Sequence, residues 1–326
     1  MGVQNLIGRR RPLFRRFGRL TGHGDRPFNL LLLIAGLAVL GLVFAIALEL
    51  WGNSALSRAA FGWSFLWTTT WDPVAREFGT LAFIVGTLQT SLLALLVALP
   101  ISLGIAIFLA ELAPSWLRTP LGFLVELLAA VPSVVYGLWG LYVFIPAVVR
   151  PLSRFLAKYL GDIPLFTGPA FGPSRLAASL VLAIMILPTI SAVSRDVFKA
   201  IPRSQREASL ALGATQWETI WRVLIPYGLS GILGAVILGL GRALGETMAV
   251  TMVIGNSLKL GISYVQPGAT MASVIVNEFT EATYPLYLHA LVEIGLVLFA
   301  MTLVLNTIAR ALVWSVARRV PREARA

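Results

Sequence analysis

Residues 194–226 read SRDVFKAIPRSQREASLALGATQWETIWRVLIP, a polar stretch set between two long apolar runs. Ser204 precedes Glu207 by three positions, and Thr215 precedes Glu218 by the same interval. Each pair therefore has the spacing of a capping box, in which a hydroxyl and a carboxylate satisfy free backbone N–H groups at a helix start. The stretch predicts two consecutive helices that project from one side of an apolar domain.

A tight turn is expected between these two helices. Gly213 stands where the first helix would end, since glycine readily adopts the left-handed conformation of a C-cap, and Pro226 marks the junction with the next apolar run. The first helix has a small apolar face flanked by charges, made by Ala208, Ala211 and Leu212 with Arg206 and Glu207 beside them. This face fits the groove of a partner protein or the chain's own bilayer, and the residues alone favour neither.

The composition is that of an all-α integral membrane protein. Hydrophobic residues make up 57% of the 326 residues and charged residues 13%, against roughly 25% charged in a soluble domain. Six apolar runs each approach or exceed the roughly 20 residues that a bilayer requires. We expect one six-span domain over residues 28–316, with a helical loop at 201–226. The expected spans are about 28–51, 78–112, 121–147, 174–198, 226–256 and 285–315.

The distribution of Lys and Arg predicts that both termini face the cytoplasm. Most of the 26 basic residues fall on the side that holds the basic leader 1–27, the loop at 201–226 and the basic tail 317–326. The net charge of +11 then reflects topology and contact with anionic lipid headgroups, and no nucleic acid partner is expected. On the opposite side, MASVIVNEF at 271–279 predicts a short helix.

Several kinds of chemistry are disfavoured by the residue inventory. The chain has no cysteine and only two histidines, His23 and His289, so we expect no metal site. Its three lysines follow Ala, Phe and Leu, which leaves no G-K-[ST] element and no Walker A site; they are Lys158, Lys199 and Lys259. We expect no cofactor in this chain, and any ATP with its Mg²⁺ must be bound by another polypeptide.

One charge pair lies inside an apolar run. Residues 241–250 read GRALGETMAV, and Arg242 and Glu246 are one helical turn apart, close enough to pair. An arginine within a span is costly and is a functional candidate by default, since its guanidinium can bind two oxygens of an anion at once. A purely structural ion pair is the less favoured alternative. Glu293 and His289 in the last run either line the same pathway or lie near an interface.

The loop resembles the EAA signature of the membrane subunits of ABC importers. Glu207, Ala208, Gly213 and Pro226 fall on that pattern, and Ser209 replaces its third alanine. In that family the loop forms a coupling helix in a cleft of a separate ATP-hydrolysing subunit. The resemblance therefore implies that these five residues couple the chain to an ATPase.

The resemblance narrows at residues 239–256 and 277–306, which are similar to the C-type permease of phosphate-specific ABC importers. It implies a type I importer permease fold in the bacterial inner membrane and a transport subunit without an ATPase site of its own. The implied partners are a homologous A-type permease, two ATPase subunits and an extracytoplasmic phosphate-binding protein. Transport in that family is thought to depend on the residues matching Arg242 and Glu246.

Three alternatives stay open. A permease for another oxyanion, molybdate or sulfate, would use the same guanidinium donors. An ion-coupled secondary transporter would need no ATPase, and the ordered loop at 201–226 disfavours it. A membrane-embedded enzyme is least favoured, because no Ser/His, Asp/Asp or metal-ligand constellation lies near an expected membrane face.

Overall fold

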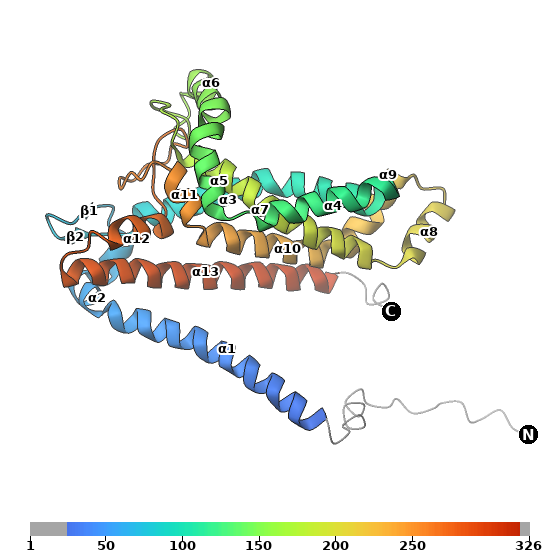
Figure 1. Ribbon diagram of the computed structural model, residues 1–326, viewed down its shortest axis with the longest axis horizontal. Coiled ribbons are helices and arrows are strands. Elements are labelled where there is room, and N and C mark those ends of the chain that lie inside the picture. Colours follow the sequence, from blue (N-terminus) through green and yellow to red (C-terminus); the bar gives the residue numbers. More distant parts are fainter. Residues whose placement is uncertain (1–24, 320–326) are drawn as a thin grey trace, which may run out of the picture. The chain divides into compact units, whose positions relative to one another are not determined.

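The computed structural model describes residues 25–319, with side chains from Phe28 to Ser315 (Figure 1). The expected basic leader and tail lie outside these residues, except where α1 begins and α13 ends. The first half contains α1 (Asp25–Asn53), α2 (Ala55–Phe61), the 3₁₀ turn η2 (Gly62–Leu66), β1 (Trp71–Asp72), β2 (Glu77–Phe78), α3 (Leu81–Ile107), the π-helical η3 (Phe108–Leu112), α4 (Ser115–Ala130), α5 (Ser133–Trp139), the π-helical η4 (Gly140–Val149) and α6 (Arg150–Leu160). The second half contains α7 (Arg175–Ala200), α8 (Arg203–Ala211), α9 (Gln216–Thr219), the π-helical η5 (Ile220–Leu224), α10 (Ile225–Gly245), α11 (Met248–Val253), α12 (Met271–Phe279) and α13 (Pro285–Arg319).

Six helical segments in the described chain are long and apolar enough to cross a membrane. They are Phe28–Asn53, Leu81–Leu112, Ser133–Leu160, Arg175–Ala200, Gln216–Gly245 and Pro285–Ser315. The first belongs largely to a separate unit, residues 1–49, and its described side chains are mostly exposed and apolar. A helix that is apolar on all sides is typical of a membrane span.

In the second unit, residues 50–326, α7 is the central helix. Helices α3, α4 and α10 pack against it, and α13 packs against α10 (Figure 1). Gly231 and Gly239 of α10 allow a close approach to α7, because a Cβ at these positions would lie 2.5 Å from Val197 and 2.6 Å from Ile190. Small residues on α10 thus serve packing within this chain.

The third expected span, 121–147, differs from the structure. Val131 and Pro132 have extended backbone angles, so the helix is interrupted between α4 and α5. Proline has no N–H to donate and disfavours a helical conformation at the residue before it. The chain continues through η4 into α6, which runs across the direction of α10 and α13 (Figure 1). The apolar run therefore forms two helical segments.

The fifth expected span, 226–256, is displaced toward the N-terminus. Helix α9 continues through the π-helical η5 into α10, so the segment begins at Gln216, before Pro226. A π turn in front of a proline relieves the contact between its ring and the preceding carbonyl. At the other end the helix stops at Gly245, and α11 follows as a separate short helix.

The short helix expected at residues 271–279 is confirmed. Helix α12 spans Met271–Phe279 and begins with a capping box between Thr270 and Ser273. It packs on α13 beside an aromatic cluster around the β1–β2 hairpin, in which Trp71 and Phe78 have ring centroids 4.8 Å apart.

Candidate functional site: a cation beside a membrane cavity and a docking hairpin

Arg242 lies in the last turn of α10 and points toward α7. Its Nη1 donates a hydrogen bond of 3.3 Å to Oγ1 of Thr189. The residue is half-buried, and no carboxylate among the described residues lies within ion-pair distance of it. Arg242 is therefore a cation inside the apolar region that no carboxylate of the described part of the chain neutralises.

The expected pairing of Arg242 with Glu246 is wrong. Glu246 has ψ of 126°, so the chain leaves the helix at this residue and the geometry of an i, i+4 pair is lost. Its Oε1 instead accepts a hydrogen bond of 3.3 Å from the backbone N–H of Ala249. Because the first N–H groups of a helix lack partners within the helix, this bond stabilises the start of α11.

A cavity of about 1140 Å³ opens beside Arg242. Residues of α7, α10 and α13 form its walls: Thr189, Gly234, Ile237, Leu238, Gly241, Arg242, Leu303, Asn306, Thr307, Arg310, Val313 and Trp314. The lining holds two arginines and no aspartate or glutamate. A concave surface of this charge attracts anions.

Glu293 and His289 do not line this cavity. Glu293 is 5% exposed on the face of α13 that packs against α2, with Arg58 of α2 within electrostatic range. Oε2 of Glu293 and Nδ1 of His289 are buried without a hydrogen-bond partner among the described residues. The structure separates this pair from Arg242.

The two-helix loop of the sequence is present as a projecting hairpin, which we call the coupling hairpin (α8 and α9, residues 203–219). The capping box expected at Ser204 and Glu207 is wrong, because Pro202 occupies the N-cap and Ser204 lies within the first turn of α8. The capping box at Thr215 and Glu218 is confirmed, with Oγ1 of Thr215 accepting from the N–H of Glu218 at 3.2 Å.

Gly213 forms the predicted left-handed turn, with φ of +86°. The N–H of Gly213 donates to the carbonyl of Leu210 at 2.9 Å, and that of Ala214 donates to the carbonyl of Ser209 at 3.2 Å. This is the bond pattern of a Schellman motif. Oγ of Ser209 also hydrogen-bonds with Oγ1 of Thr219 at 2.9 Å, which ties α8 to α9.

The outer face of the coupling hairpin is exposed and carries large apolar side chains among polar ones. Leu212 is 90% exposed, and Trp217 of α9 and Trp221 of the following η5 are more than half exposed. Glu207 and Ala208 are exposed on α8, and Pro226 is exposed at the start of α10. Large apolar side chains in contact with solvent or headgroups mark a surface suited to a partner.

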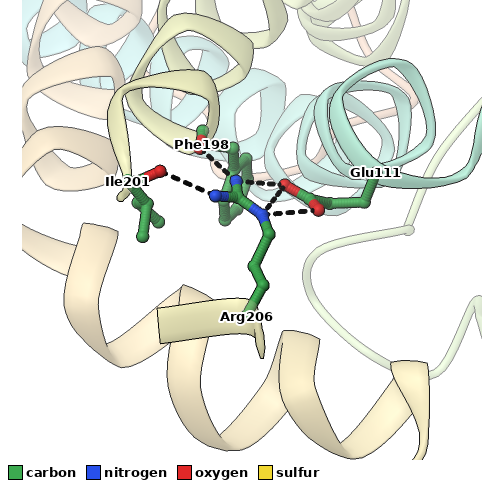
Figure 2. Close-up of polar contacts among 4 residues, drawn as sticks. All are labelled: Glu111, Phe198, Ile201 and Arg206. Atoms are coloured by element: carbon green, nitrogen blue, oxygen red, sulfur yellow. Dashed lines mark hydrogen bonds and ion pairs between the residues drawn. The ribbon is translucent and has the colours of Figure 1, made fainter. Parts of the chain in front are cut away.

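Arg206 is the residue of this hairpin whose role the sequence did not reveal. Its Nε donates to Oε2 of Glu111 at 2.9 Å and its Nη2 to Oε1 at 2.6 Å (Figure 2). Nη1 and Nη2 also donate to the carbonyls of Ile201 and Phe198, each at 2.6 Å (Figure 2). Arg206 therefore fixes α8 to the ends of α7 and η3. The sequence shows Glu111 only as a single charged residue at the end of the second apolar run, and this does not identify Arg206 as its partner.

Comparison with known proteins supports the same architecture. The family described as binding-protein-dependent transport system inner membrane component matches residues 102–322. The phosphate transport system permease protein PstC of Pasteurella multocida is 48% identical over 286 residues, covering 86% of this chain and 89% of that protein. The chain belongs to this transport family and, within it, to the PstC permeases.

Other PstC permeases show comparable similarity. The PstC protein of Xylella fastidiosa strain Temecula1 is 46% identical over 300 residues, covering 90% of this chain and 92% of that protein. Among solved structures, an inward-facing form of the MetNI methionine ABC transporter superposes with a TM-score of 0.52 at 17% identity, covering 76% of this chain and 99% of the other. The latter likeness shows the fold, a type I importer permease. Like other PstC permeases, the chain is a multi-pass protein of the bacterial inner membrane.

Proposed function

We propose that this PstC-family chain is the membrane-spanning permease of an ATP-driven phosphate importer. It forms half of the translocation pathway with an A-type sister permease. Two copies of a separate ATPase, which bind ATP and Mg²⁺, drive it, and an extracytoplasmic phosphate-binding protein delivers the anion. The observation that carries this proposal is Arg242, an unneutralised cation on the wall of a cavity without carboxylates.

Arg242 contacts the anion in this proposal. A guanidinium offers a planar set of donors that matches two oxygens of a tetrahedral oxyanion. Of the donors of the Arg242 guanidinium, only Nη1 forms a hydrogen bond, at 3.3 Å to Oγ1 of Thr189. The other donors have no acceptor among the described residues. Since Glu246 is turned toward α11, it does not compete with the anion for this cation.

The coupling hairpin transmits the movement of the ATPase. Its exposed face, with Glu207, Ala208 and Leu212, docks in the cleft of the ATPase. Helices α9, η5 and α10 are continuous from Gln216 to Gly245, so a displacement of the hairpin moves the helix that carries Arg242. Ser209 and Gly213 hold the two helices of the hairpin at a fixed angle.

The test of the pathway role replaces Arg242 in a strain that relies on this permease for phosphate uptake. Arg242→Gln removes the charge and is expected to abolish uptake of labelled phosphate while the complex still assembles. Arg222→Gln, on the same continuous helix and 80% exposed, is the matched control and keeps normal uptake. Normal uptake in Arg242→Gln contradicts the proposal, and competition by sulfate and molybdate identifies the preferred anion.

The docking role is tested by charge reversal at Glu207. Glu207→Arg is expected to reduce co-purification of the ATPase subunits, because the substitution changes the exposed face of α8. Asp196→Arg reverses an exposed charge near the end of α7 and is the control. Full recovery of the ATPase with Glu207→Arg excludes docking through this face.

A further inference from the structure

The cavity beside Arg242 is lined largely by α10 and α13. These two helices run antiparallel to each other (Figure 1). One face of α10 lines it from Gly234 to Arg242, and one face of α13 lines it from Leu303 to Trp314. The lining stretch of α10 is nine residues long, an axial rise of about 12 Å at about 1.5 Å per residue. The cavity is therefore elongated along α10 and α13, and we call it the passage below.

Arg242 and Arg310 occupy different depths of this passage. Arg242 is in the last turn of α10, whereas Arg310 is in the C-terminal third of α13. Because the two helices run in opposite directions, Arg310 lies toward the side where α10 begins and the coupling hairpin projects (Figure 1). By the distribution of basic residues this is the cytoplasmic side.

Arg310 also has no carboxylate partner among the residues whose side chains the structure describes. Among residues 28–315 it makes no hydrogen bond and no ion pair within 4 Å. Asn306 and Thr307 precede it by four and three positions and line the same wall, so an amide and a hydroxyl lie on its face of α13. The hydroxyl of Thr307 donates its one hydrogen bond to the carbonyl of Leu303 at 2.7 Å, so Arg310 and the amide of Asn306 are the groups on this wall that can donate to an anion.

We propose that Arg310 and Asn306 form a second binding site, which we call the second station, and that it receives the tetrahedral oxyanion after the anion leaves Arg242. This inference rests on the proposed function, because it assumes that the anion passes Arg242. A phosphate group is the ligand chemistry in question, and the transported ion is its source. The headgroup of an anionic phospholipid offers the same chemistry and is distinguished by experiment.

Two stations in a wide passage suit transport better than one tight site. A permeating ion must bind well enough to enter and weakly enough to leave, and successive weak sites meet both requirements. The cavity volume of about 1140 Å³ far exceeds that of a phosphate ion, so water accompanies the anion and screens its contact with either arginine. Arg310 then lowers the barrier to exit without retaining the anion.

The test uses the complete importer in proteoliposomes whose ATPase subunits face the bath. Labelled phosphate and the binding protein are enclosed in the lumen, and ATP in the bath drives phosphate outward, so the bath is the exit side. Arg310→Gln is expected to slow transport about tenfold, the effect of losing a charged hydrogen bond. Unlabelled phosphate in the bath should also inhibit the variant about tenfold less potently, because its return site is weakened.

Inhibition by unlabelled phosphate in the bath separates a binding role of Arg310 from a structural one. Misfolding lowers the transport rate but does not change the phosphate concentration that inhibits from the exit side. Arg310→Lys keeps the charge and should retain part of both effects. Lys199→Gln removes an exposed charge at the end of α7, outside the cavity, and should match the unsubstituted importer. If the Arg310→Gln complex does not assemble, Asn306→Leu is measured in the same way.

Three outcomes overturn the inference. If Arg310→Gln transports normally and keeps its inhibition while Arg242→Gln is inactive, the second station fails and the proposed function stands. If Arg242→Gln is also normal, the proposed function fails. If the Arg310→Gln defect occurs in vesicles with phosphatidylglycerol but not in pure phosphatidylcholine, a lipid headgroup occupies the station.

Discussion

Arg206 on the coupling hairpin binds both carboxylate oxygens of Glu111, with Nη2 of Arg206 2.6 Å from Oε1 of Glu111. The side chains are 20% and 14% exposed, so solvent screens this ion pair only in part. The same guanidinium binds two carbonyls at the end of α7, those of Phe198 and of the C-cap residue Ile201. The hairpin is thereby attached to the ends of two other helices.

Loss of this contact is expected to uncouple ATP hydrolysis from transport. Arg206→Gln removes several charged hydrogen bonds and should destabilise the attachment by about 2 kcal/mol or more. We expect phosphate uptake per ATP hydrolysed to fall severalfold in proteoliposomes while the ATPase subunits remain bound. Arg203→Gln, an exposed arginine on the same helix, should leave the ratio unchanged. An unchanged ratio in Arg206→Gln contradicts a coupling role.

The partnership itself is tested by a double-mutant cycle. Glu111→Gln should also lower phosphate uptake per ATP hydrolysed. The double variant with Arg206→Gln should lose less of this uptake than the sum of the two single effects. Additive effects would mean that the two residues act independently.

The sequence predicts the apolar helices and the hairpin turn because both depend on local chemistry. Gly213 and the box at Thr215 involve residues at most five positions apart, so pattern alone identifies them. The pair of Arg206 with Glu111 joins positions 95 apart in sequence, and no local pattern reveals such a contact.

The contacts of Arg242 are likewise only partly predictable from the sequence. Its position in an apolar helix marks it as costly, and hence as a candidate, from composition alone. A pair with Glu246 requires a helix that continues to that residue, and the structure ends the helix at Gly245. Neither Thr189 nor the cavity wall supplied by α13 is close to Arg242 in sequence.

The turn of the coupling hairpin should depend on glycine at position 213. At φ of +86°, Gly213→Ala forces a Cβ into the left-handed region at a cost of about 1 kcal/mol, although no atom obstructs it. We expect weaker binding of the ATPase, measured by co-purification. Gly213→Asn tolerates this conformation better and should bind nearly normally. Equal losses for both substitutions would point to a steric cause.

Gly86 on α3 should tolerate no larger side chain. A Cβ there would lie 2.1 Å from the backbone oxygen of Ala269, in a loop whose position is also fixed by the capped helix that follows. Gly86→Ala is therefore expected to destabilise the protein by about 3 kcal/mol. The yield of folded protein in detergent and its thermal midpoint measure this loss. Gly104→Ala, in open space on the same helix, should be neutral or slightly stabilising.

Substitutions at Glu246 distinguish its observed hydrogen bond to Ala249 from the ion pair with Arg242 that the sequence suggests. Its carboxylate accepts a hydrogen bond from Ala249, and an amide oxygen can accept the same bond. Glu246→Gln should therefore retain most phosphate uptake, whereas Glu246→Leu, which leaves the start of α11 without this acceptor, should lose about tenfold.

The competing expectation differs in a measurable way. If Glu246 neutralised Arg242, loss of its charge alone would matter, and Glu246→Gln would be as defective as Glu246→Leu. Uptake of labelled phosphate by the two variants, at equal amounts of assembled complex, decides between capping of α11 and pairing with Arg242. Near-normal uptake in Glu246→Gln also implies that Arg242 keeps its charge without a protein counter-ion, as an anion contact requires.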